Sequence, residues 1–370
     1  MQVVVGAAVV RDGRVLACRR RYPPEAAGRW ELPGGKAEDG EKAEVALARE
    51  IREELGCEVA VGRRLAGAEK VRDGLELWAY VATLVDGEPV PHEHDAARWL
   101  APEELDDVDW LVPDRPFLAE LREVLLDGTE LVGGNVGGAV RIGRTVRRPV
   151  GPWTPAVHRV LGLARERGVP CVPRVLGEDA RGREVLDYLP GTIVDVDDEL
   201  LTDGQLAAAA RWLRRLHDAM AGEDVNGPWR WFDVPAPTVI GHNDVAPYNL
   251  CFEGDHLTGV FDWDLAGPTT PAFELAHLAW TGVPLFRERP ADEVARRLRI
   301  LERSYEGPCA AGILGAVFEL KRLAVDGINA WIAGGDPAGR AQAAAGEPAR
   351  TEEALAALAE RRPGIEEALR

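Results

Sequence analysis

The chain has 370 residues, more than one ordinary hydrophobic core can serve, so the sequence predicts two domains or two domains with an appendage. A hydrophobic content of 46% and a charged content of 29% are typical of a soluble globular protein. The formal net charge of −18 argues against a nucleic-acid backbone or an anionic membrane as the main partner, but not against a nucleotide bound with divalent cations.

The cysteines and the apolar runs point to a reducing compartment. The five cysteines are scattered without a C-x-x-C pair, so neither a disulfide framework nor a zinc site is expected. The sequence opens without a basic leader and contains no apolar run of 18 residues, so we expect no signal peptide and no membrane span. The expected location is therefore the cytoplasm.

Residues 1–128 are predicted to form a first domain in which strands and helices alternate. The apolar stretches 2–10 and 14–21 flank an Arg-Asp-Gly turn and predict a β-hairpin. An acidic helix follows and ends at Gly56. Strands are predicted over 75–85 and 96–100, and a helix over 115–127 closes the domain.

Residues 129–335 are predicted to form a second, α+β domain. Three short strands are expected within 129–151, then a helix that starts with Thr154 as its cap, and a strand within 183–191. From Thr202 onward the pattern is mostly helical, apart from an extended stretch over 238–264. Residues 336–370 are predicted to be a flexible link and a last helix.

The acidic helix places Glu50, Glu53 and Glu54 on one side, directly after Arg49. Like charges at these spacings repel by roughly 0.2–0.5 kcal/mol per pair, so a cation is expected beside them. Carboxylate oxygens that converge from one face suit Mg²⁺ or Mn²⁺. The preceding pair, Gly34 and Gly35, allows close approach of the backbone.

The spacing of this stretch resembles the Nudix box. Gly35 is followed after five residues by Glu41 and after seven more by the run from Arg49 to Cys57. The resemblance covers about residues 1–125 and is strongest to the MutT branch with its (d)CTP-hydrolysing relatives, because "GRWELPGGK" and "RPFLAEL" also match. It implies an α/β/α sandwich with a mixed sheet that hydrolyses a nucleoside triphosphate to a monophosphate and pyrophosphate with a divalent metal.

The resemblance also implies roles for individual residues. Metal binding or water activation would fall to Glu50, Glu53 and Glu54, with Glu53 favoured as the base although the choice stays open. Arg49 would orient these glutamates, and Arg20 would contact phosphate. Further metal ligands would be the Gly34 carbonyl and Glu93 from a loop. The nucleoside would be bordered by Glu31, Leu32, Pro33 and Gly34.

Two observations bear on the substrate. No proline lies between Pro33 and Pro89, which disfavours the ADP-ribose branch of the family. Asp114, taken as a carboxylate that only accepts hydrogen bonds, could bind the amino group of cytosine or the ring N–H groups of 8-oxoguanine, with cytosine favoured. His92 and His94 are expected to be exposed loop residues on either side of Glu93.

A second constellation lies in the second domain. His242, Asp244 and Asn249 reproduce the H-x-D-x-x-x-x-N spacing of the kinase catalytic loop, and Asp262 follows on a predicted strand. With "RWLRRLHD" and "PAFELAHLAW", the region 130–335 resembles aminoglycoside and choline phosphotransferases. The resemblance implies a short β small lobe and a helical large lobe. Asp244 would accept a proton from a small hydroxyl or amine compound, and Asn249 and Asp262 would hold Mg²⁺ on ATP.

The same region departs from the kinase pattern. No lysine occurs between Lys70 and Lys321, so Arg147 or Arg148 would have to replace the strand lysine. The partner glutamate is also missing, with His158 near its place, and the glycine run 133–138 is either a phosphate-covering loop or a hairpin turn. The second domain is therefore either an active phosphotransferase or a degenerate binding module. The complete set of box glutamates favours an enzyme over a nucleotide sensor in the first domain.

Overall fold

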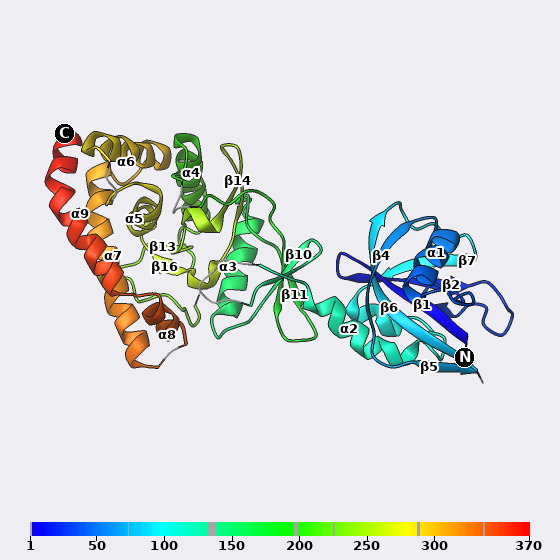
Figure 1. Ribbon diagram of the computed structural model, residues 1–370. Coiled ribbons are helices and arrows are strands. Elements are labelled where there is room, and N and C mark those ends of the chain that lie inside the picture. Colours follow the sequence, from blue (N-terminus) through cyan, green and yellow to red (C-terminus); the bar gives the residue numbers. More distant parts are fainter. Residues whose placement is uncertain are drawn as a thin grey trace. The chain divides into compact units, whose positions relative to one another are not determined.

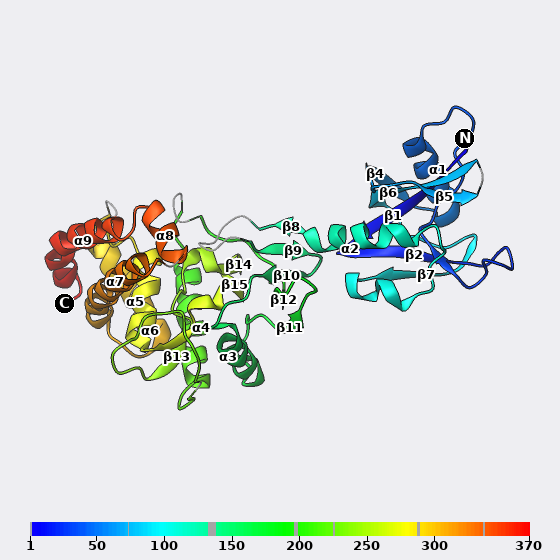
Figure 2. The ribbon, with the colours of Figure 1, turned by 90° about the horizontal axis from the view of Figure 1, so that it is seen from below.

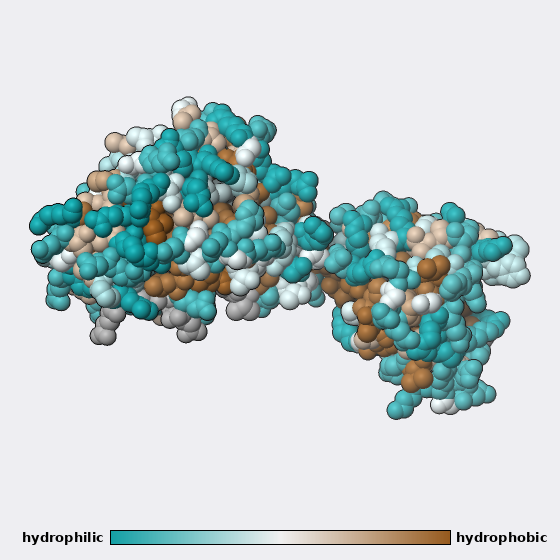
Figure 3. All heavy atoms as spheres, turned by 90° about the horizontal axis from the view of Figure 1, so that it is seen from above, coloured by the Kyte–Doolittle hydropathy of each residue, from teal (hydrophilic) through white to brown (hydrophobic). Residues whose placement is uncertain are grey.

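The computed structural model describes residues 2–72, 74–131, 138–195, 199–224, 226–286, 289–335 and 337–370. The chain forms two compact units (Figure 1). The first contains Met1–Leu131 and Val140–Val146, and the second includes Arg147–Arg370. On the face drawn in Figure 3, hydrophilic side chains predominate on both units. No helix in the described ranges is long and apolar enough to cross a membrane.

The first unit is built on a seven-stranded mixed sheet with the strand order β3-β2-β1-β6-β4, to which β5 and β7 add by pairing with β6 and β2. Strands β1 and β6 pair in parallel and their other neighbours pair antiparallel. The strands are β1 (Gln2–Arg11), β2 (Arg14–Arg20), β3 (Trp30–Glu31), β4 (Glu58–Arg64), β5 (Glu69–Arg72), β6 (Leu75–Asp86) and β7 (His94–Leu100).

Each face of this sheet is covered by helix. Side chains of β1 alternate between the two faces, so that Val5, Ala7 and Val9 pack with α1 (Ala43–Leu55), while Ala8 joins the core beneath α2 (Leu118–Asp127). The second core also holds Leu105 of the 3₁₀ helix η1 (Pro102–Asp107) and Phe117 of η2 (Arg115–Phe117). The predicted α/β/α sandwich is therefore confirmed. Strands β8 (Thr129–Glu130) and β9 (Val140–Ile142) also belong to this unit and pair antiparallel with each other.

The second unit combines short strands of three to five residues with longer helices (Figure 2). The strands β11 (Val175–Glu178), β12 (Glu184–Asp187) and β10 (Thr145–Arg148) lie side by side near α3 (Thr154–Glu166). Two short antiparallel pairs follow. Strand β13 (Val239–Gly241) pairs with β16 (Gly267–Thr269), and β14 (Leu250–Glu253) forms a hairpin with β15 (His256–Val260). The larger helices are α4 (Asp203–Ala219), α5 (Pro271–Gly282), α6 (Ala291–Tyr305), α7 (Ala310–Ala333), α8 (Pro337–Ala344) and α9 (Ala349–Ala368).

Three local predictions need correction. The flexible link expected after residue 335 contains α8, because its alanines favour helix and Pro337 occupies the first turn. Trp153, not Thr154, caps α3, since the Thr154 hydroxyl accepts a hydrogen bond from the Gly151 N–H. Asp262 lies two residues beyond the end of β15 in a left-handed conformation (φ 60°), not on the strand. The glycine run 133–138 lies, except for Gly138, outside the described residues.

Candidate active sites

The segment that carries Gly34 and Gly35 is held tightly between β1 and α1. The N–H groups of Val5 and Ala7 donate to the carbonyls of Gly35 and Pro33, each at 2.8 Å. Gly34 has φ +147°, and a Cβ at this position would lie 2.1 Å from the Val5 carbonyl oxygen. A Cβ on Gly35 would lie 2.3 Å from Oε2 of Glu50. Backbone contact and conformation therefore require glycine at position 34, whereas a side chain at position 35 would displace the carboxylate of Glu50.

Arg49 connects three of the acidic side chains. Its guanidinium donates to Glu41 at 3.0 and 3.1 Å, to Glu50 at 2.9 Å and to Glu53 at 3.4 Å, and also to the carbonyl of Lys36 at 3.2 Å. One cation thus reduces the repulsion between carboxylates on α1. This geometry agrees with the orienting role that the resemblance implies for Arg49.

The three glutamates of α1 differ in their surroundings. The Glu53 side chain is 58% exposed, whereas that of Glu50 is 16% exposed. Glu54 is buried, and its Oε2 accepts a hydrogen bond from the Gly34 N–H at 2.9 Å. Burial raises the pKa of Glu54 to about 7, against the opposing effects of His94 and the Gly34 N–H. Glu53 is therefore the glutamate most free to move.

The donor set around α1 suits a hard divalent cation. It offers carboxylate oxygens and the Gly34 carbonyl, which are the ligand types that Mg²⁺ and Mn²⁺ prefer, and the absence of a Cβ at Gly35 lets the carboxylate of Glu50 approach this segment. Within the described ranges, no three Asp, Glu, His or Cys side chains are already close enough to hold a metal. Glu93 is exposed in the bend before β7. Exposed side chains such as Glu53 and Glu93 would therefore have to turn toward the ion.

His94 is the first site residue that sequence reasoning placed wrongly. It is buried at the start of β7, opposite Arg20, not exposed in a loop. Its Nε2 lies 3.0 Å from Oε1 of the buried Glu31, and the same oxygen accepts a hydrogen bond from Arg20 Nε at 2.6 Å. Burial alone would lower the pKa of His94, but the hydrogen bond with Glu31 and the charge of Glu54 outweigh it and raise the pKa.

Asp114 is buried next to the segment expected to border the nucleoside. Its Oδ1 accepts a hydrogen bond from the Leu32 N–H at 3.1 Å. Burial raises the pKa of Asp114 to about 8, although the Leu32 N–H opposes this. At neutral pH the group is therefore mostly a neutral carboxyl, which can donate as well as accept a hydrogen bond. The expectation that Asp114 only accepts is corrected on this point.

We expect Gly35→Ala to lower turnover by more than about 10-fold, because the new Cβ would push Glu50 away from its position and a small misplacement can cost about 10²-fold. The change is compatible with the backbone, since the φ angle of Gly35 lies outside the left-handed region. A control is Gly162→Ala on α3, where a Cβ would meet no atom within 4 Å. Steady-state pyrophosphate release measures the effect, and equal rates for the two variants would contradict the steric argument.

In the second unit, the predicted catalytic loop is fixed by Glu274 of α5. The buried carboxylate accepts hydrogen bonds from the N–H groups of His242 (3.0 Å) and Asn243. Asn249 donates its amide to the carbonyl and to Oδ2 of Asp244, both at 2.9 Å. The residues predicted for this site, Asp244 and Asn249, are therefore adjacent, as the kinase-like spacing requires.

Both carboxylate oxygens of Asp244 are in contact with protein groups. Asn249 donates to Oδ2, while Oδ1 accepts from the Tyr248 hydroxyl at 3.2 Å and lies 2.9 Å from Nε2 of His277. Burial would raise the pKa of Asp244, but the interaction with His277 and the other partners lower it. The carboxylate is thus ionised and already partnered.

Asp262 is paired with an arginine of β10. The guanidinium of Arg148 donates to Asp262 Oδ1 at 2.9 Å and lies 3.0 Å from Oδ2 of Asp264. Arg148 also lies 3.8 Å from Glu184 of β12, and Glu184 contacts His158 of α3 at 2.7 Å. Burial raises the pKa of Asp262, against the effect of Arg148. Of the two arginines considered from the sequence, Arg148 is the one that reaches Asp262.

Sequence reasoning missed His277 and assigned no role to Lys321. Lys321 comes from α7, is buried, and lies 4.9 Å from the ring of Trp280. Burial lowers the pKa of Lys321 to about 8, although Asp244 opposes the shift. His277 lies within the stretch PAFELAHLAW that supports the phosphotransferase resemblance, whereas Lys321 carries no motif. Helices α5 and α7 bring the two residues near Asp244 through tertiary packing.

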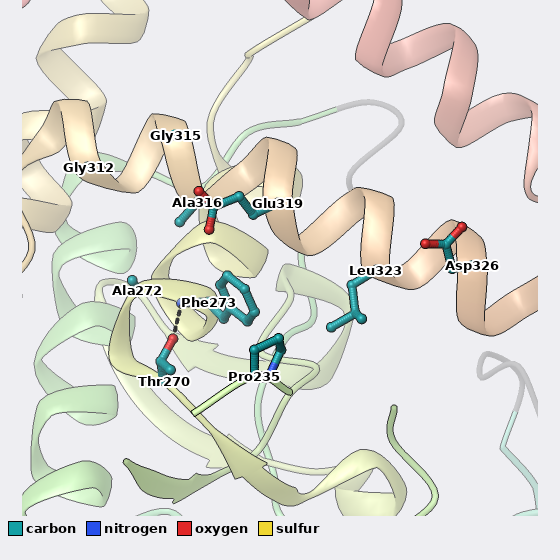
Figure 4. Close-up of a pocket in the computed structure, with 10 residues that line it drawn as sticks. All are labelled: Pro235, Thr270, Ala272, Phe273, Gly312, Gly315, Ala316, Glu319, Leu323 and Asp326. Carbon is teal, nitrogen blue, oxygen red and sulfur yellow. Dashed lines mark hydrogen bonds between the residues drawn. The ribbon is translucent and has the colours of Figure 1, made fainter. Parts of the chain in front are cut away.

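A cavity of about 670 Å³ lies between α5 and α7 in the second unit (Figure 4). Phe273, Leu323 and Pro235 supply apolar walls, while Glu319 and Asp326 supply carboxylates and none of the lining residues is basic. Such a lining suits a positively charged or neutral group better than an anion.

We expect Glu274→Gln to lower the stability of the second unit by about 1–3 kcal/mol, because hydrogen bonds of buried N–H groups to a charged acceptor are replaced by weaker ones. Chemical unfolding monitored by tryptophan fluorescence measures the change. Glu319→Gln on the exposed side of α7 is the control. Unfolding curves that coincide for the two variants would show that Glu274 does not anchor the loop.

Comparison with known proteins relates both units to described families. The NUDIX domain model matches residues 1–121, and the model named phosphotransferase enzyme family matches residues 228–308. A putative 8-oxo-dGTP diphosphatase 2 of Mycobacterium tuberculosis is 47% identical over 127 residues, which are 34% of this chain and 90% of the relative. CTP pyrophosphohydrolase of Escherichia coli is 41% identical over 27% of this chain and 76% of its own length.

The chain belongs to the NUDIX family through its first unit, and it is a hydrolase of nucleoside triphosphates by membership of that family, whose members generally need a divalent metal. The second unit carries the phosphotransferase-family segment. A trifolitoxin immunity protein of Rhizobium leguminosarum bv. trifolii is 33% identical over 44% of this chain and 65% of the relative. The Nudix and phosphotransferase-like resemblances are thereby confirmed.

Proposed function

We propose that the first unit hydrolyses (d)CTP-type nucleotides or 8-oxo-dGTP to the monophosphate and pyrophosphate with Mg²⁺ or Mn²⁺, and so removes unwanted nucleotides from the cytoplasmic pool. The observation that carries the proposal is the hydrogen bond from the Gly34 N–H to the Glu54 carboxylate. It joins the segment expected to border the nucleoside to the acidic face of α1. The named activities of the two Nudix relatives, an 8-oxo-dGTP diphosphatase and a CTP pyrophosphohydrolase, support both substrate classes.

Each group of this site has a distinct task in the proposed mechanism. Glu50, Glu53, Glu54, Glu93 and the Gly34 carbonyl would hold the cation, which when bound neutralises phosphate charge and acidifies water. Glu53 acts as the general base, because its exposed carboxylate can reach a water molecule. Arg49 keeps Glu50 in place, and Arg20, whose Nε is held by Glu31, turns the remaining guanidinium N–H groups toward phosphate.

Asp114 is proposed to read the base. Its Oδ1 accepts a hydrogen bond from the Leu32 N–H and has a second lone pair, so both oxygens can pair with a base. A neutral carboxyl both donates and accepts, which matches N3 and the amino group of cytosine as well as O6 and a ring N–H of 8-oxoguanine. The preference for cytosine that follows from an acceptor-only group therefore disappears, and both bases fit.

The experiment is a substrate panel with the full chain and Mg²⁺, comprising 8-oxo-dGTP, dCTP, CTP, 5-methyl-dCTP and ADP-ribose, with dGTP as the reference nucleotide. We expect pyrophosphate release from a cytosine nucleotide or from 8-oxo-dGTP at a kcat/KM at least about 10-fold above that for dGTP. A difference of about 1–2 kcal/mol in transition-state binding between two bases is enough for a 10-fold ratio. ADP-ribose turnover is measured by the release of AMP, because this compound gives no pyrophosphate. Turnover of ADP-ribose alone, or of no compound, would reject the proposal.

For the second unit we propose a binding role in place of phosphotransfer, because protein groups contact both oxygens of Asp244, the residue that would accept the proton. ATP turnover by the full chain should therefore be absent with a panel of hydroxyl and amine acceptors. Acceptor-dependent release of ADP that is lost in Asp244→Ala would establish phosphotransfer.

A further inference from the structure

The strongest charged cluster outside the first unit's site surrounds Arg148. This side chain is 15% exposed and lies among three carboxylates, those of Asp262 (2.9 Å), Asp264 (3.0 Å) and Glu184 (3.8 Å). In the kinase-like pattern, an aspartate in the position of Asp262 would bind the metal that accompanies ATP. Here a guanidinium from β10 is already bonded to it.

A second arginine and a histidine extend the cluster. Arg230 lies 3.1 Å from the same oxygen of Asp264 that Arg148 contacts, and its guanidinium packs 4.5 Å from the ring of Trp153. His158 contacts Glu184 at 2.7 Å from the other side. Three carboxylates thus face two guanidinium groups and an imidazole that donates or shares a proton.

This balance of charge disfavours a divalent cation. Ions such as Mg²⁺ are held by carboxylates whose charge is not otherwise compensated. An added doubly charged ion next to Asp262 would lie close to the guanidinium of Arg148, and in a buried site like charges repel more strongly than in water. On α1 of the first unit Arg49 contacts Glu50 and Glu53, but the Glu53 side chain is 58% exposed and can turn away. Glu54 accepts its hydrogen bond from the Gly34 N–H and is not bonded to Arg49.

We propose that Arg148 takes the place of the divalent cation in the second unit, so that Asp262 and Asn249 bind neither Mg²⁺ nor Mn²⁺. The residues here do not fit the metal that the kinase-like pattern implies. An anionic ligand of this unit would meet the N–H groups of Arg148 and Arg230 directly, without an intervening ion. The inference concerns a site that the proposed hydrolysis does not use and stands independently of that reaction.

The test is a titration of the full chain with Mn²⁺, followed by the electron paramagnetic resonance signal of the free ion. The background chain carries Glu50→Gln, Glu53→Gln and Glu54→Gln, which removes the acidic ligands of α1. We expect this background chain and its Asp262→Asn variant to bind the same amount of Mn²⁺, with or without a non-hydrolysable ATP analogue. Adding Arg148→Gln to the background should create one Mn²⁺ site. Adding Asp262→Asn to that variant should abolish the site.

Arg147→Gln is the matched control, because Arg147 lies next to Arg148 on β10 but faces Asp179 at 3.8 Å. It should leave Mn²⁺ binding unchanged. The proposal is overturned if the background chain, with Arg148 intact, binds one equivalent of Mn²⁺ that Asp262→Asn removes. It is also overturned if folded Arg148→Gln gains no site. Circular dichroism verifies the fold, and if Arg148→Gln is unfolded, the comparison of the background with its Asp262→Asn variant decides.

Discussion

Replacing Glu54 by glutamine should abolish pyrophosphate release by the first unit while leaving its fold intact. The amide oxygen of glutamine can still accept the hydrogen bond from the Gly34 N–H, so the contact between the segment and α1 survives. The negative charge that would face the cation is lost. We expect turnover to fall by more than about 100-fold, because mutation of residues that only support a metal ligand already lowers activity by about 10–100-fold.

A control on the same helix distinguishes the effect of losing a charge at the site from the effect of losing any negative charge on α1. Glu44 lies in the first turn of α1 and is exposed, so Glu44→Gln should retain normal turnover. Both variants should show the same melting temperature within a few degrees. Undiminished pyrophosphate release by a folded Glu54→Gln variant would contradict the assignment of Glu54 to the site.

Replacing Asp114 by asparagine should remove a large decrease in the free energy of unfolding that the parent chain shows as the pH rises. The pKa of Asp114 is about 8 in the folded chain, against 3.8 for the unperturbed group. As the pH rises, the unfolded chain therefore releases this proton at a lower pH than the folded chain does. The contribution of Asp114 to the free energy of unfolding is fully present below about pH 4 and is lost as the pH rises through about 8. A pKa difference of one between the folded and unfolded chain corresponds to about 1.4 kcal/mol, so the expected loss is several kcal/mol.

Asparagine stays neutral over this range, and its amide oxygen can accept the Leu32 N–H. Urea unfolding at about pH 5, 7 and 9 measures the difference between the variant and the parent chain. The difference should grow with pH in favour of asparagine, whereas Asp39→Asn in an exposed turn should behave like the parent. A pH-independent difference would show that Asp114 is ionised in the folded chain.

Local sequence signals predicted several elements of the first unit and its acidic face, whereas the sandwich architecture followed from the resemblance to the Nudix family. The hairpin of β1 and β2, the end of α1 at Gly56 and the glycine pair before it all depend on neighbours in the sequence, and all occur as predicted. Strands β4 and β5 were not predicted, because most of their side chains are exposed and show no alternation of apolar and polar residues.

What the sequence could not supply are contacts between distant residues. The burial of His94 depends on its pairing with Arg20 and on Glu31, and the neutral state of Asp114 depends on complete burial beside Leu32. In the second unit, Arg148 reaches Asp262 across more than a hundred residues. Spacing identifies which residues carry chemistry, but pKa values and counter-ions follow from tertiary packing.

Residues 32–34 connect the two acids that matter most in the first unit. The N–H of Leu32 is bound by Asp114, and two residues later the N–H of Gly34 is bound by Glu54. If a bound base displaces this three-residue segment, the hydrogen bond between Gly34 and Glu54 would carry the displacement to the acidic side of α1. For sites coupled in this way, linkage requires that the nucleobase alters the affinity for a cation by the same factor by which the cation alters the affinity for that nucleobase.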